Sequence, residues 1–371
     1  MKILWFTWKD MEHPFAGGAE VVNELLAEQM VKDGHEVIFL VGDFGNPKTP
    51  NHRTEVTRKG FRVIRLGNQW TLYARAMMYY FTHLRDWPDL IIDESNAVPF
   101  FVRFYAKQRS IYFIHQLSRK VWFYQMFFPV HILGYLLEPI YVWLMRKSLT
   151  VTISESTKKD LLRFGFKKDN VHVLTQCTEI LPVKSLDVVV KRRNPTMLSL
   201  GTIRPMKRTH LVIQAFEEAK KKIPNLELIV CGMAVGLYGE YIFKLINNSP
   251  YKDSITYKGK VTEEEKVRYM AESHVICVSS IKEGWGLIVT EAALNGTPAV
   301  VYNVDGLRDS VIDGVTGLLT TENTPKGMAD SVARLLSDDK IYRSMQVKGL
   351  EYARKFTPEN MYKDFKKYAG I

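Results

Sequence analysis

SSIKEGWGLIVTEAA, at residues 279–293, carries the strongest structural signal in the chain. The apolar run that ends near Ser279 predicts a buried strand, the glycines after it predict a tight loop, and a helix is expected to start near Gly286. The Asn295-Gly296 pair is typical of a helix end, and another apolar run follows it directly. This order predicts a strand–helix–strand unit of a parallel sheet.

The loop and the helix start in this stretch suit an anionic ligand. Amides at a helix start lack partners inside the helix, and with the helix dipole they favour a negative charge. The amides concerned belong to Gly284, Trp285, Gly286 and Leu287. Glu283 and Glu291 flank them, and a continuous helix would place these two residues about 12 Å apart. We consider a diphosphate site between two carboxylates and, as the alternative, a glycine hinge with two surface glutamates.

The alternation of strands and helices extends over the whole chain. Helical periodicity predicts helices at 19–32 and 209–222. Apolar runs predict strands at 3–7, 36–41, 88–92, 110–114, 149–153, 196–200, 226–231, 274–278 and 298–302. We therefore expect an α/β protein with two Rossmann-like domains in tandem, whose ligands bind beyond the carboxyl ends of the strands.

The length of 371 residues also suits two domains. The charged, strand-poor stretch at 184–195 is the predicted linker. We expect an N-terminal domain at 1–185 and a C-terminal domain at 192–357. The last helix, near 358–371, is expected to pack back on the N-terminal domain.

A second candidate for phosphate binding follows the strand at 196–200. Gly201 opens a loop that contains Arg204 and Lys207, whose charged groups can hydrogen-bond to phosphate oxygens. Basic side chains opposite an amide-rich helix start would neutralise a diphosphate by themselves. The chain contains no Asp-x-Asp sequence, so we expect neither a carboxylate-held metal ion nor another cofactor. The alternative is a pair of solvated charges at a helix end.

Two features of the first half are weaker candidates. Gly17 and Gly18, within the stretch Phe15–Glu20, would let a ligand approach the backbone at a helix start. They lack the Gly-x-Gly-x-x-Gly spacing, so a plain turn into a helix is the alternative. His115 follows the strand at 110–114, where a histidine can donate to a hydroxyl group or to a developing phosphate charge. A structural histidine is the alternative there.

Composition limits the partners and the compartment. The formal net charge of +11 is compatible with nucleic acid, an anionic lipid surface, acidic small substrates or simple solvation. No known nucleic-acid module is present, so nucleic acid is not expected. The three cysteines lie far apart, which fits a reducing compartment. No secretory leader follows Met1, so we expect a cytoplasmic protein.

Residues 121–145 are densely apolar and aromatic, with basic residues on both sides. Pro129, Glu138 and Pro139 interrupt the run, so a transmembrane helix is not expected. One interpretation is a patch that contacts a membrane interface through 119–147. The alternative is helix surface buried in the core between domains. A similar stretch at 72–87 would extend the patch.

Together these motifs resemble the retaining glycosyltransferases of family 4, which have the GT-B fold: two Rossmann-like domains facing each other across a deep cleft. Glu283 and Glu291 match the Glu-x7-Glu element of that family, and residues 292–300 match its Ala-Ala-x-x-Gly-x-Pro-x-Val run. Further matches lie at 17–20, 34–37, 154–156 and 304–319. The resemblance covers nearly the whole chain.

The resemblance implies a role for each candidate residue. Glu283 would contact the transferred sugar and Glu291 the donor ribose. Lys207 would bind the diphosphate, and His115 would line the acceptor side of the transferred sugar. Gly284, Trp285 and Gly286 would offer backbone amides to the sugar or the diphosphate. Gly17 and Gly18 would let the donor or the acceptor approach the N-terminal domain.

The implied activity is retaining transfer of a hexose from a UDP- or GDP-linked sugar to a saccharide or lipid-linked acceptor. No metal is implied, and the acceptor would be met in the cytoplasm or at the inner membrane face. The sequence does not determine the donor base, the sugar, the acceptor, the linkage or the oligomeric state.

Three positions depart from the family pattern. The usual Gly-Arg-Leu is Gly201-Thr202-Ile203 here, and Arg204 is the candidate to supply the guanidinium. The usual Lys-Gly is Lys207-Arg208, and the usual Asn-Gly turn is Gln176-Cys177-Thr178. They leave open a catalytically inactive nucleotide-sugar-binding homologue that acts as a membrane-associated subunit. A nucleotide-sugar epimerase is a further alternative.

Overall fold

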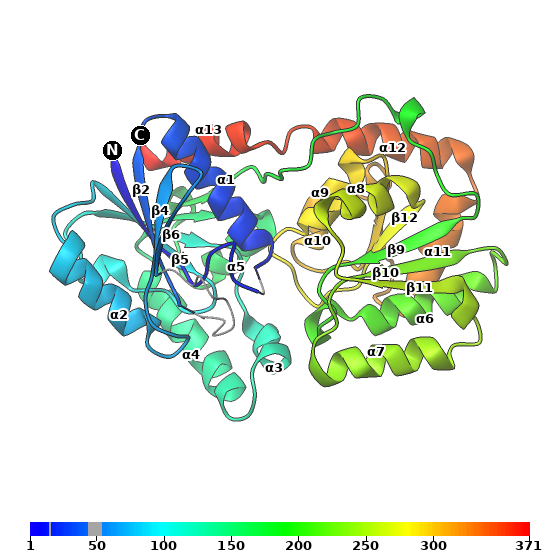
Figure 1. Ribbon diagram of the computed structural model, residues 1–371, viewed down its shortest axis with the longest axis horizontal. Coiled ribbons are helices and arrows are strands. Elements are labelled where there is room, and N and C mark those ends of the chain that lie inside the picture. Colours follow the sequence, from blue (N-terminus) through cyan, green and yellow to red (C-terminus); the bar gives the residue numbers. More distant parts are fainter. Residues whose placement is uncertain (15, 44–53) are drawn as a thin grey trace. The chain divides into compact units, whose positions relative to one another are not determined.

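The computed structural model describes residues 1–14, 16–43 and 54–371. The chain divides into two compact units. Unit 1 contains Met1–Trp122, Phe128–Glu179 and Phe356–Ile371, and unit 2 contains Phe123–Phe127 and Ile180–Lys355. Figure 1 shows that each unit is a sheet with helices packed against it. The predicted α/β class is confirmed.

Unit 1 has an eight-stranded sheet among the described residues, in the order β3-β4-β2-β1-β5-β6-β7-β8. Its strands are β1 (Lys2–Phe6), β2 (Glu36–Val41), β3 (Glu55–Arg58), β4 (Phe61–Arg65), β5 (Leu90–Ser95), β6 (Arg109–Ile114), β7 (Leu149–Thr152) and β8 (Val171–Val173). All neighbours pair in parallel except β3 and β4. The chain runs outward from β1 in one direction and from β5 in the other, so the strand order reverses between these two strands.

The helices of unit 1 include the last helix of the chain. They are α1 (Gly18–Lys32), α2 (Leu72–Tyr79), α4 (Val130–Met145), α5 (Glu155–Arg163) and α13 (Pro358–Ala369); α3 (Trp122–Gln125) begins at the edge of the unit. Helix α13 packs on α1, where the Tyr362 hydroxyl donates to the Asp33 carboxylate over 2.7 Å. Met361 and Phe365 of α13 are fully buried. The C-terminal residues thus belong to the same unit as the N-terminal strand.

Unit 2 has a six-stranded parallel sheet in the order β11-β10-β9-β12-β13-β14. The strands are β9 (Thr196–Leu200), β10 (Glu227–Cys231), β11 (Ile255–Gly259), β12 (Val275–Val278), β13 (Ala299–Val301) and β14 (Gly317–Leu319). The helices are α6 (Thr209–Lys220), α7 (Gly236–Asn248), α8 (Glu263–Glu272), α9 (Leu287–Leu294), α10 (Leu307–Ser310), α11 (Pro325–Leu336) and α12 (Asp339–Ala353). The strand order reverses between β9 and β12.

Both faces of the unit 2 sheet are covered by helices. Neighbouring residues of a strand point to opposite faces, so both kinds of position are buried. Met197 of β9 packs on the side covered by α6, α7 and α11, and Leu198 packs on the side covered by α8, α9 and α10. Two apolar layers therefore hold one sheet in the Rossmann-like arrangement.

The predicted strands at 36–41 and 196–200 are confirmed with the predicted bounds. The sequence analysis missed β3, β4, β8, β11 and β14. Strand β3 alternates between exposed and half-buried residues at the sheet edge, so it lacks an apolar run. Strands β8 and β14 have only three residues each, too few for a periodic signal.

The predicted linker is packed rather than free over part of its length. Leu186 lies in an apolar cluster with residues of α9 and α12. The Lys191 ammonium donates to the carbonyl oxygens of Ala271 and Ser273 and to the Thr297 hydroxyl, over 2.6–2.8 Å. These contacts fix the chain against unit 2 before β9 begins.

Candidate functional site

The loop after β12 lies at the strand-order reversal of unit 2. β9 and β12 are neighbours, so the loops after their carboxyl ends, 201–208 and 279–286, lie at the same edge of the sheet. In open parallel sheets ligands bind at such a reversal. Gly286 ends the second loop with φ of 92°, a left-handed conformation that favours glycine. A side chain there would also meet Leu307 at 2.8 Å.

Lys207 and Glu283 meet at this edge. The Lys207 ammonium donates to Glu283 Oε1 over 2.6 Å, and the Ser280 hydroxyl donates to the same oxygen. Neither side chain is fully buried: 24% of Lys207 and 12% of Glu283 is exposed. The predicted cation and the first predicted carboxylate are therefore in contact and still accessible to a ligand.

Backbone and hydroxyl contacts hold the two loops together. The Ser279 hydroxyl donates to the Arg208 carbonyl oxygen over 2.9 Å, and the Ile281 amide donates to the Met206 carbonyl oxygen over 3.0 Å. Arg208 itself has φ of 52° and ψ of 40°, a left-handed conformation. The family usually has glycine at this position, and Arg208 adopts the conformation for which glycine is suited.

A second turn supports Glu283 from behind. The Glu283 amide donates to the Asp305 carbonyl oxygen over 3.0 Å. Gly306 has φ of 81°, and a side chain there would collide with the Glu283 carbonyl oxygen. The Lys282 ammonium pairs with the Asp305 carboxylate at 3.3 Å. The match noted at 304–319 thus includes the residues that fix the position of Glu283.

Glu291 has its own cationic partner. It lies in the second turn of α9, is 5% exposed, and its Oε2 is 3.0 Å from the Lys266 ammonium of α8. Lys266 also pairs with Glu263 at 3.1 Å. Burial would lower the pKa of Lys266, but the two carboxylates raise it above its ordinary value. Glu291 is therefore held in place by its contact with Lys266. Because α9 starts only at Leu287, Glu283 does not share one continuous helix with it.

The remaining candidates of unit 2 lie in the same loops. The Trp285 indole N–H donates to the Thr290 hydroxyl over 2.9 Å, so this side chain holds the loop against α9. Gly201 has φ of 132° directly after β9. Arg204 is half-buried, and its Nε has no hydrogen-bond partner among the described residues. The Arg204 carbonyl oxygen accepts from the Lys207 amide, which closes the turn.

In unit 1 Gly17 and Gly18 are exposed at the start of α1. Gly17 has φ of −146°, an extended conformation that any residue adopts, so backbone strain does not require glycine there. Its amide donates to the Glu20 carboxylate over 2.7 Å. Phe15, in the same predicted stretch, lies outside the described residues. Close approach of a ligand remains the reason we expect for the paired glycines.

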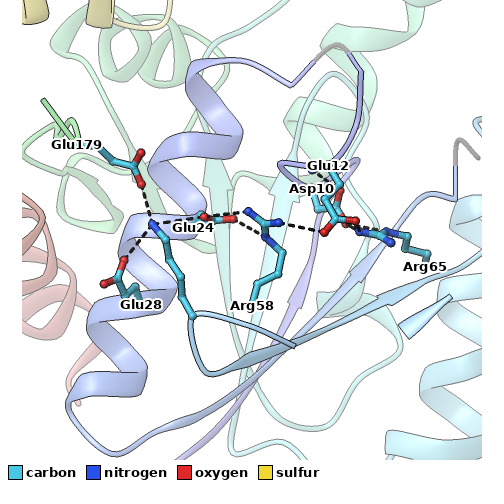
Figure 2. Close-up of polar contacts among 8 residues, drawn as sticks. Asp10, Glu12, Glu24, Glu28, Arg58, Arg65 and Glu179 are labelled. Carbon is cyan, nitrogen blue, oxygen red and sulfur yellow. Dashed lines mark hydrogen bonds and ion pairs between the residues drawn. The ribbon is translucent and has the colours of Figure 1, made fainter. Parts of the chain in front are cut away.

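Ion pairs tether the segment between β1 and α1 (Figure 2). Arg65 at the end of β4 donates to Asp10 and Glu12, and Arg58 of β3 bridges Glu12 and Glu24. Arg65 and Asp10 are only 7% and 8% exposed, so they form a nearly buried pair. The β3–β4 hairpin that the sequence analysis missed thus fixes the loop that leads to Gly17.

His115 follows β6, as predicted, and is 7% exposed. Its ring packs on Phe113 with 4.6 Å between ring centroids. Its Nε2 lies 3.3 Å from Oε1 of Glu94 in β5. The sequence analysis did not select Glu94, because a single carboxylate in an apolar strand gives no spacing signal.

The apolar segment at 121–145 divides into an inner and an outer face. Glu138 is buried and accepts from the amides of Ser118 and Arg119 and from the indole N–H of Trp122. The outer face of α4 exposes large apolar side chains by 49–59%, namely Leu133, Leu136, Leu137, Ile140 and Trp143. The first face packs in an apolar cluster of unit 1, and the second face is exposed; the membrane contact stays a prediction.

Lys266 and Gly306 also belong to the candidate site, although the sequence analysis named neither for it. Lys266 directly follows the Thr262–Glu265 capping box of α8. A charged residue in the first turns of a helix is usually predicted to lie on its exposed surface. No group of three or more metal-ligating side chains occurs within 1–14, 16–43 and 54–371.

Two family models match the chain. Residues 16–177 match the model described as Glycosyltransferase Family 4, and residues 187–355 match the model described as Glycosyl transferases group 1. The chain is 25% identical over 369 residues to the N-acetyl-alpha-D-glucosaminyl L-malate synthase of Bacillus anthracis, covering 90% of this chain and 88% of that protein. It is 30% identical over 165 residues to the D-inositol 3-phosphate glycosyltransferase of Corynebacterium diphtheriae, covering 43% of this chain and 39% of that protein.

Solved structures share the fold over the full chain. The sucrose-phosphate synthase of Thermosynechococcus elongatus has a TM-score of 0.79 at 19% identity, covering 100% of this chain and 98% of that one. The HepE protein of Anabaena, crystallised with UDP-glucose, has a TM-score of 0.74 at 17% identity, with both chains covered completely. These similarities establish the GT-B fold.

Proposed function

Because the chain belongs to glycosyltransferase family 4 and has the GT-B fold, we propose that it transfers a hexose from a UDP- or GDP-linked sugar to a saccharide or lipid-linked acceptor. We further propose that the anomeric configuration is retained and that no bound metal takes part.

The observation that carries this proposal is the contact between Lys207 and Glu283 at the strand-order reversal of unit 2. A nucleoside diphosphate leaving group is an anion that needs positive charge in the transition state. Lys207 supplies a full charge, and the amides at the start of α9 supply the positive end of the helix dipole. This combination replaces the charge that a divalent cation would provide.

The two carboxylates have separate tasks in this scheme. Glu283, exposed enough to reach a ligand, accepts hydrogen bonds from hydroxyls of the transferred sugar. Glu291, held by Lys266, accepts from the ribose hydroxyls. The bond between the anomeric carbon and the diphosphate oxygen breaks while an acceptor oxygen bonds to that carbon on the same face. The acceptor proton passes to the departing phosphate oxygen, so no dedicated base is required.

Nucleotide binding tests the donor half of the proposal. UDP, GDP and ADP are compared by thermal shift, since a ligand that binds the native state raises Tm. UDP-glucose is the first donor to assay, because the Anabaena relative was crystallised with it. Lys207→Met is expected to lose the shift while remaining folded. A folded wild-type protein that responds to no nucleoside diphosphate contradicts the proposal.

Product analysis tests the reaction itself. The donor that binds is incubated with saccharide and lipid-linked acceptors, and NMR coupling constants of the product give the anomeric configuration. Retention is expected, and so is full activity in EDTA. An inverted product or an EDTA loss restored by Mg²⁺ contradicts the mechanism. Binding without transfer to any acceptor favours the inactive homologue instead.

The acceptor is proposed to be presented at an anionic membrane surface. None of the helices that the structure describes has the length and apolarity to cross a bilayer. Helix α4 instead exposes an apolar face, with Lys120, Arg146 and Lys147 at the ends of the segment. The apolar side chains would enter the membrane interface, and the basic residues would lie near the lipid phosphates. Both features suit an anionic membrane surface. We further propose that the protein acts at the cytoplasmic membrane face.

Vesicle sedimentation tests the membrane contact. Leu136→Ser with Ile140→Ser removes two exposed side chains one helical turn apart, 59% and 56% exposed. This variant is expected to bind vesicles containing phosphatidylglycerol less than wild type does. Leu237→Ser on α7, at an 82% exposed leucine of unit 2, serves as the matched control. Equal sedimentation of all three proteins contradicts the proposal. So does wild-type protein that binds pure phosphatidylcholine vesicles as well as vesicles containing phosphatidylglycerol.

A further inference from the structure

A buried polar group lies at the strand-order reversal of unit 1. Glu94 is the fifth residue of β5, and β5 lies between β1 and β6 in the sheet. Its side chain is completely buried. Burying a carboxylate is costly unless hydrogen bonds or an opposite charge compensate it. The hydrogen-bond partners and charges around the Glu94 carboxylate therefore indicate its role.

One oxygen of Glu94 is fully used. Oε2 accepts from the indole N–H of Trp5 over 2.9 Å and from the amide nitrogen of Asn23 over 2.6 Å. Trp5 is in β1 and Asn23 is in α1, so two separate elements fix the carboxylate plane. The position of the other oxygen, Oε1, is therefore fixed as well.

That second oxygen points at His115. Oε1 of Glu94 lies 3.3 Å from Nε2 of the imidazole. Within the described part of the chain, Oε1 and both ring nitrogens have no hydrogen bond of good geometry. The ring is fixed independently by its packing on Phe113, which pairs with Glu94 across the β5–β6 ladder. The His115 ring and the Glu94 carboxylate thus face each other. Within the described residues, neither of the ring nitrogens nor Oε1 is taken up by a hydrogen bond to another group.

A carboxylate accepts hydrogen bonds and cannot donate them. The imidazole nitrogen that faces it must therefore carry the proton, and the tautomer of a histidine is set by such a neighbour. In neutral His115 this leaves Nδ1 as the nitrogen that accepts.

We propose that Glu94 is the positioning residue of His115, keeping the proton on Nε2 so that Nδ1 accepts a hydrogen bond from a substrate hydroxyl. This inference rests on the proposed function, in which His115 lines the acceptor side of the transferred sugar. It reverses the direction expected from the sequence, where His115 was considered as a donor. Glu94 touches no substrate in this scheme and acts through the ring.

Glu94→Gln tests the proposal with minimal change of shape. The glutamine oxygen takes the two hydrogen bonds from Trp5 and Asn23, which leaves its NH₂ group facing Nε2 of His115. Nε2 must then accept, and the proton moves to Nδ1. The tautomer is measured by ¹⁵N NMR of histidine-labelled protein, with the His115 signals assigned from His115→Gln.

Asp93→Asn is the matched control. Asp93 precedes Glu94 on the same strand, is 1% exposed and points to the opposite face, where it accepts from the amides of Phe100 and Val102. Burial raises the pKa of Asp93 to about 6. Its replacement is expected to lower Tm without moving the His115 signals. A merely structural role for Glu94 predicts the same result for Glu94→Gln, and an unchanged His115 tautomer in that variant overturns the proposal.

Turnover gives the second readout. Glu94→Gln is expected to lower kcat by about tenfold or more while KM for the donor changes little, because a misdirected group costs mainly in the transition state. A changed tautomer with wild-type kcat also overturns the proposal. The two failures are distinguishable: absence of turnover in the wild-type protein refutes the proposed function, whereas the tautomer comparison needs no activity.

Discussion

Replacing Glu283 by glutamine is expected to tighten binding of the nucleoside diphosphate, although it removes a residue of the site. In the structure the Lys207 ammonium donates to Glu283 over 2.6 Å, and the same ammonium is expected to bind the diphosphate. The carboxylate therefore competes with the ligand for Lys207 and repels it as a like charge. Lys207→Met should have the opposite effect, because it removes the attraction and leaves the carboxylate.

The magnitudes follow from the Lys207–Glu283 contact and from a phosphate placed about 8 Å from the Glu283 carboxylate. A hydrogen bond from an ammonium to a charged acceptor contributes about 1.5–3 kcal/mol, so Lys207→Met should raise Kd by about 10- to 150-fold. A carboxylate about 8 Å from a phosphate charge repels it by about 2 kcal/mol at an effective dielectric constant of about 20. Because Glu283 is 12% exposed, salt screening reduces this to about 1 kcal/mol. Glu283→Gln should therefore lower Kd by about fivefold.

Calorimetric titration with UDP and GDP measures both variants and the double variant. In the double variant the gain from Glu283→Gln should shrink, since part of that gain comes from freeing Lys207. Turnover should fall in Glu283→Gln even though the diphosphate binds more tightly, because the contact to the transferred sugar is lost. Weaker diphosphate binding in Glu283→Gln together with unchanged binding in Lys207→Met would refute the assigned roles.

Three further outcomes are expected. Lys266→Met should weaken nucleotide binding measured by calorimetry, because Glu291 loses the partner that holds it at 3.0 Å; unchanged Kd would remove Lys266 from the site. Arg65→Met should lower the free energy of unfolding by about 3–5 kcal/mol in urea titrations, since it leaves nearly buried Asp10 without its cationic partner; a loss below about 1 kcal/mol would show that water reaches the pair. Burial, with Lys191 nearby, lowers the pKa of His274 to about 4, so the native state resists its protonation. The stability this contributes is present above about pH 6.5 and is lost as pH falls towards 4, and His274→Asn should show a smaller loss by denaturation at each pH.

The fold was predictable because its signals are local. Apolar runs of four to six residues give the central strands β2, β9 and β12, and helical periodicity gives α1 and α6. Strand β3 escaped prediction because an edge strand buries only part of one face. The strand order of each sheet depends on how these elements pair, which local periodicity does not contain.

The candidate site was predictable only in part. Gly286 has the positive φ that a tight loop into a helix requires. A glycine at this point of the sequence is enough to indicate such a conformation. Gly17 has no such φ, so the same argument from paired glycines does not apply to it. The partners of the carboxylates depend on tertiary contacts, since Lys207 reaches Glu283 across 76 positions of sequence. Lysines on helices are so common on surfaces that Lys266 carried no signal of its own.

The three departures from the family pattern now differ in weight. Arg208 occupies the left-handed conformation of the usual glycine, at a strain of about 1–2 kcal/mol, so the turn that positions Lys207 is preserved. Gln176 and Arg204 are different, because each has one side-chain nitrogen atom that lacks a hydrogen-bond partner in the part of the chain that the structure describes. Arg204 lies in the loop that carries Lys207, three residues before it. The choice between an active transferase and an inactive homologue therefore depends on whether Arg204 binds the diphosphate, and the change at Arg208 contributes nothing to it.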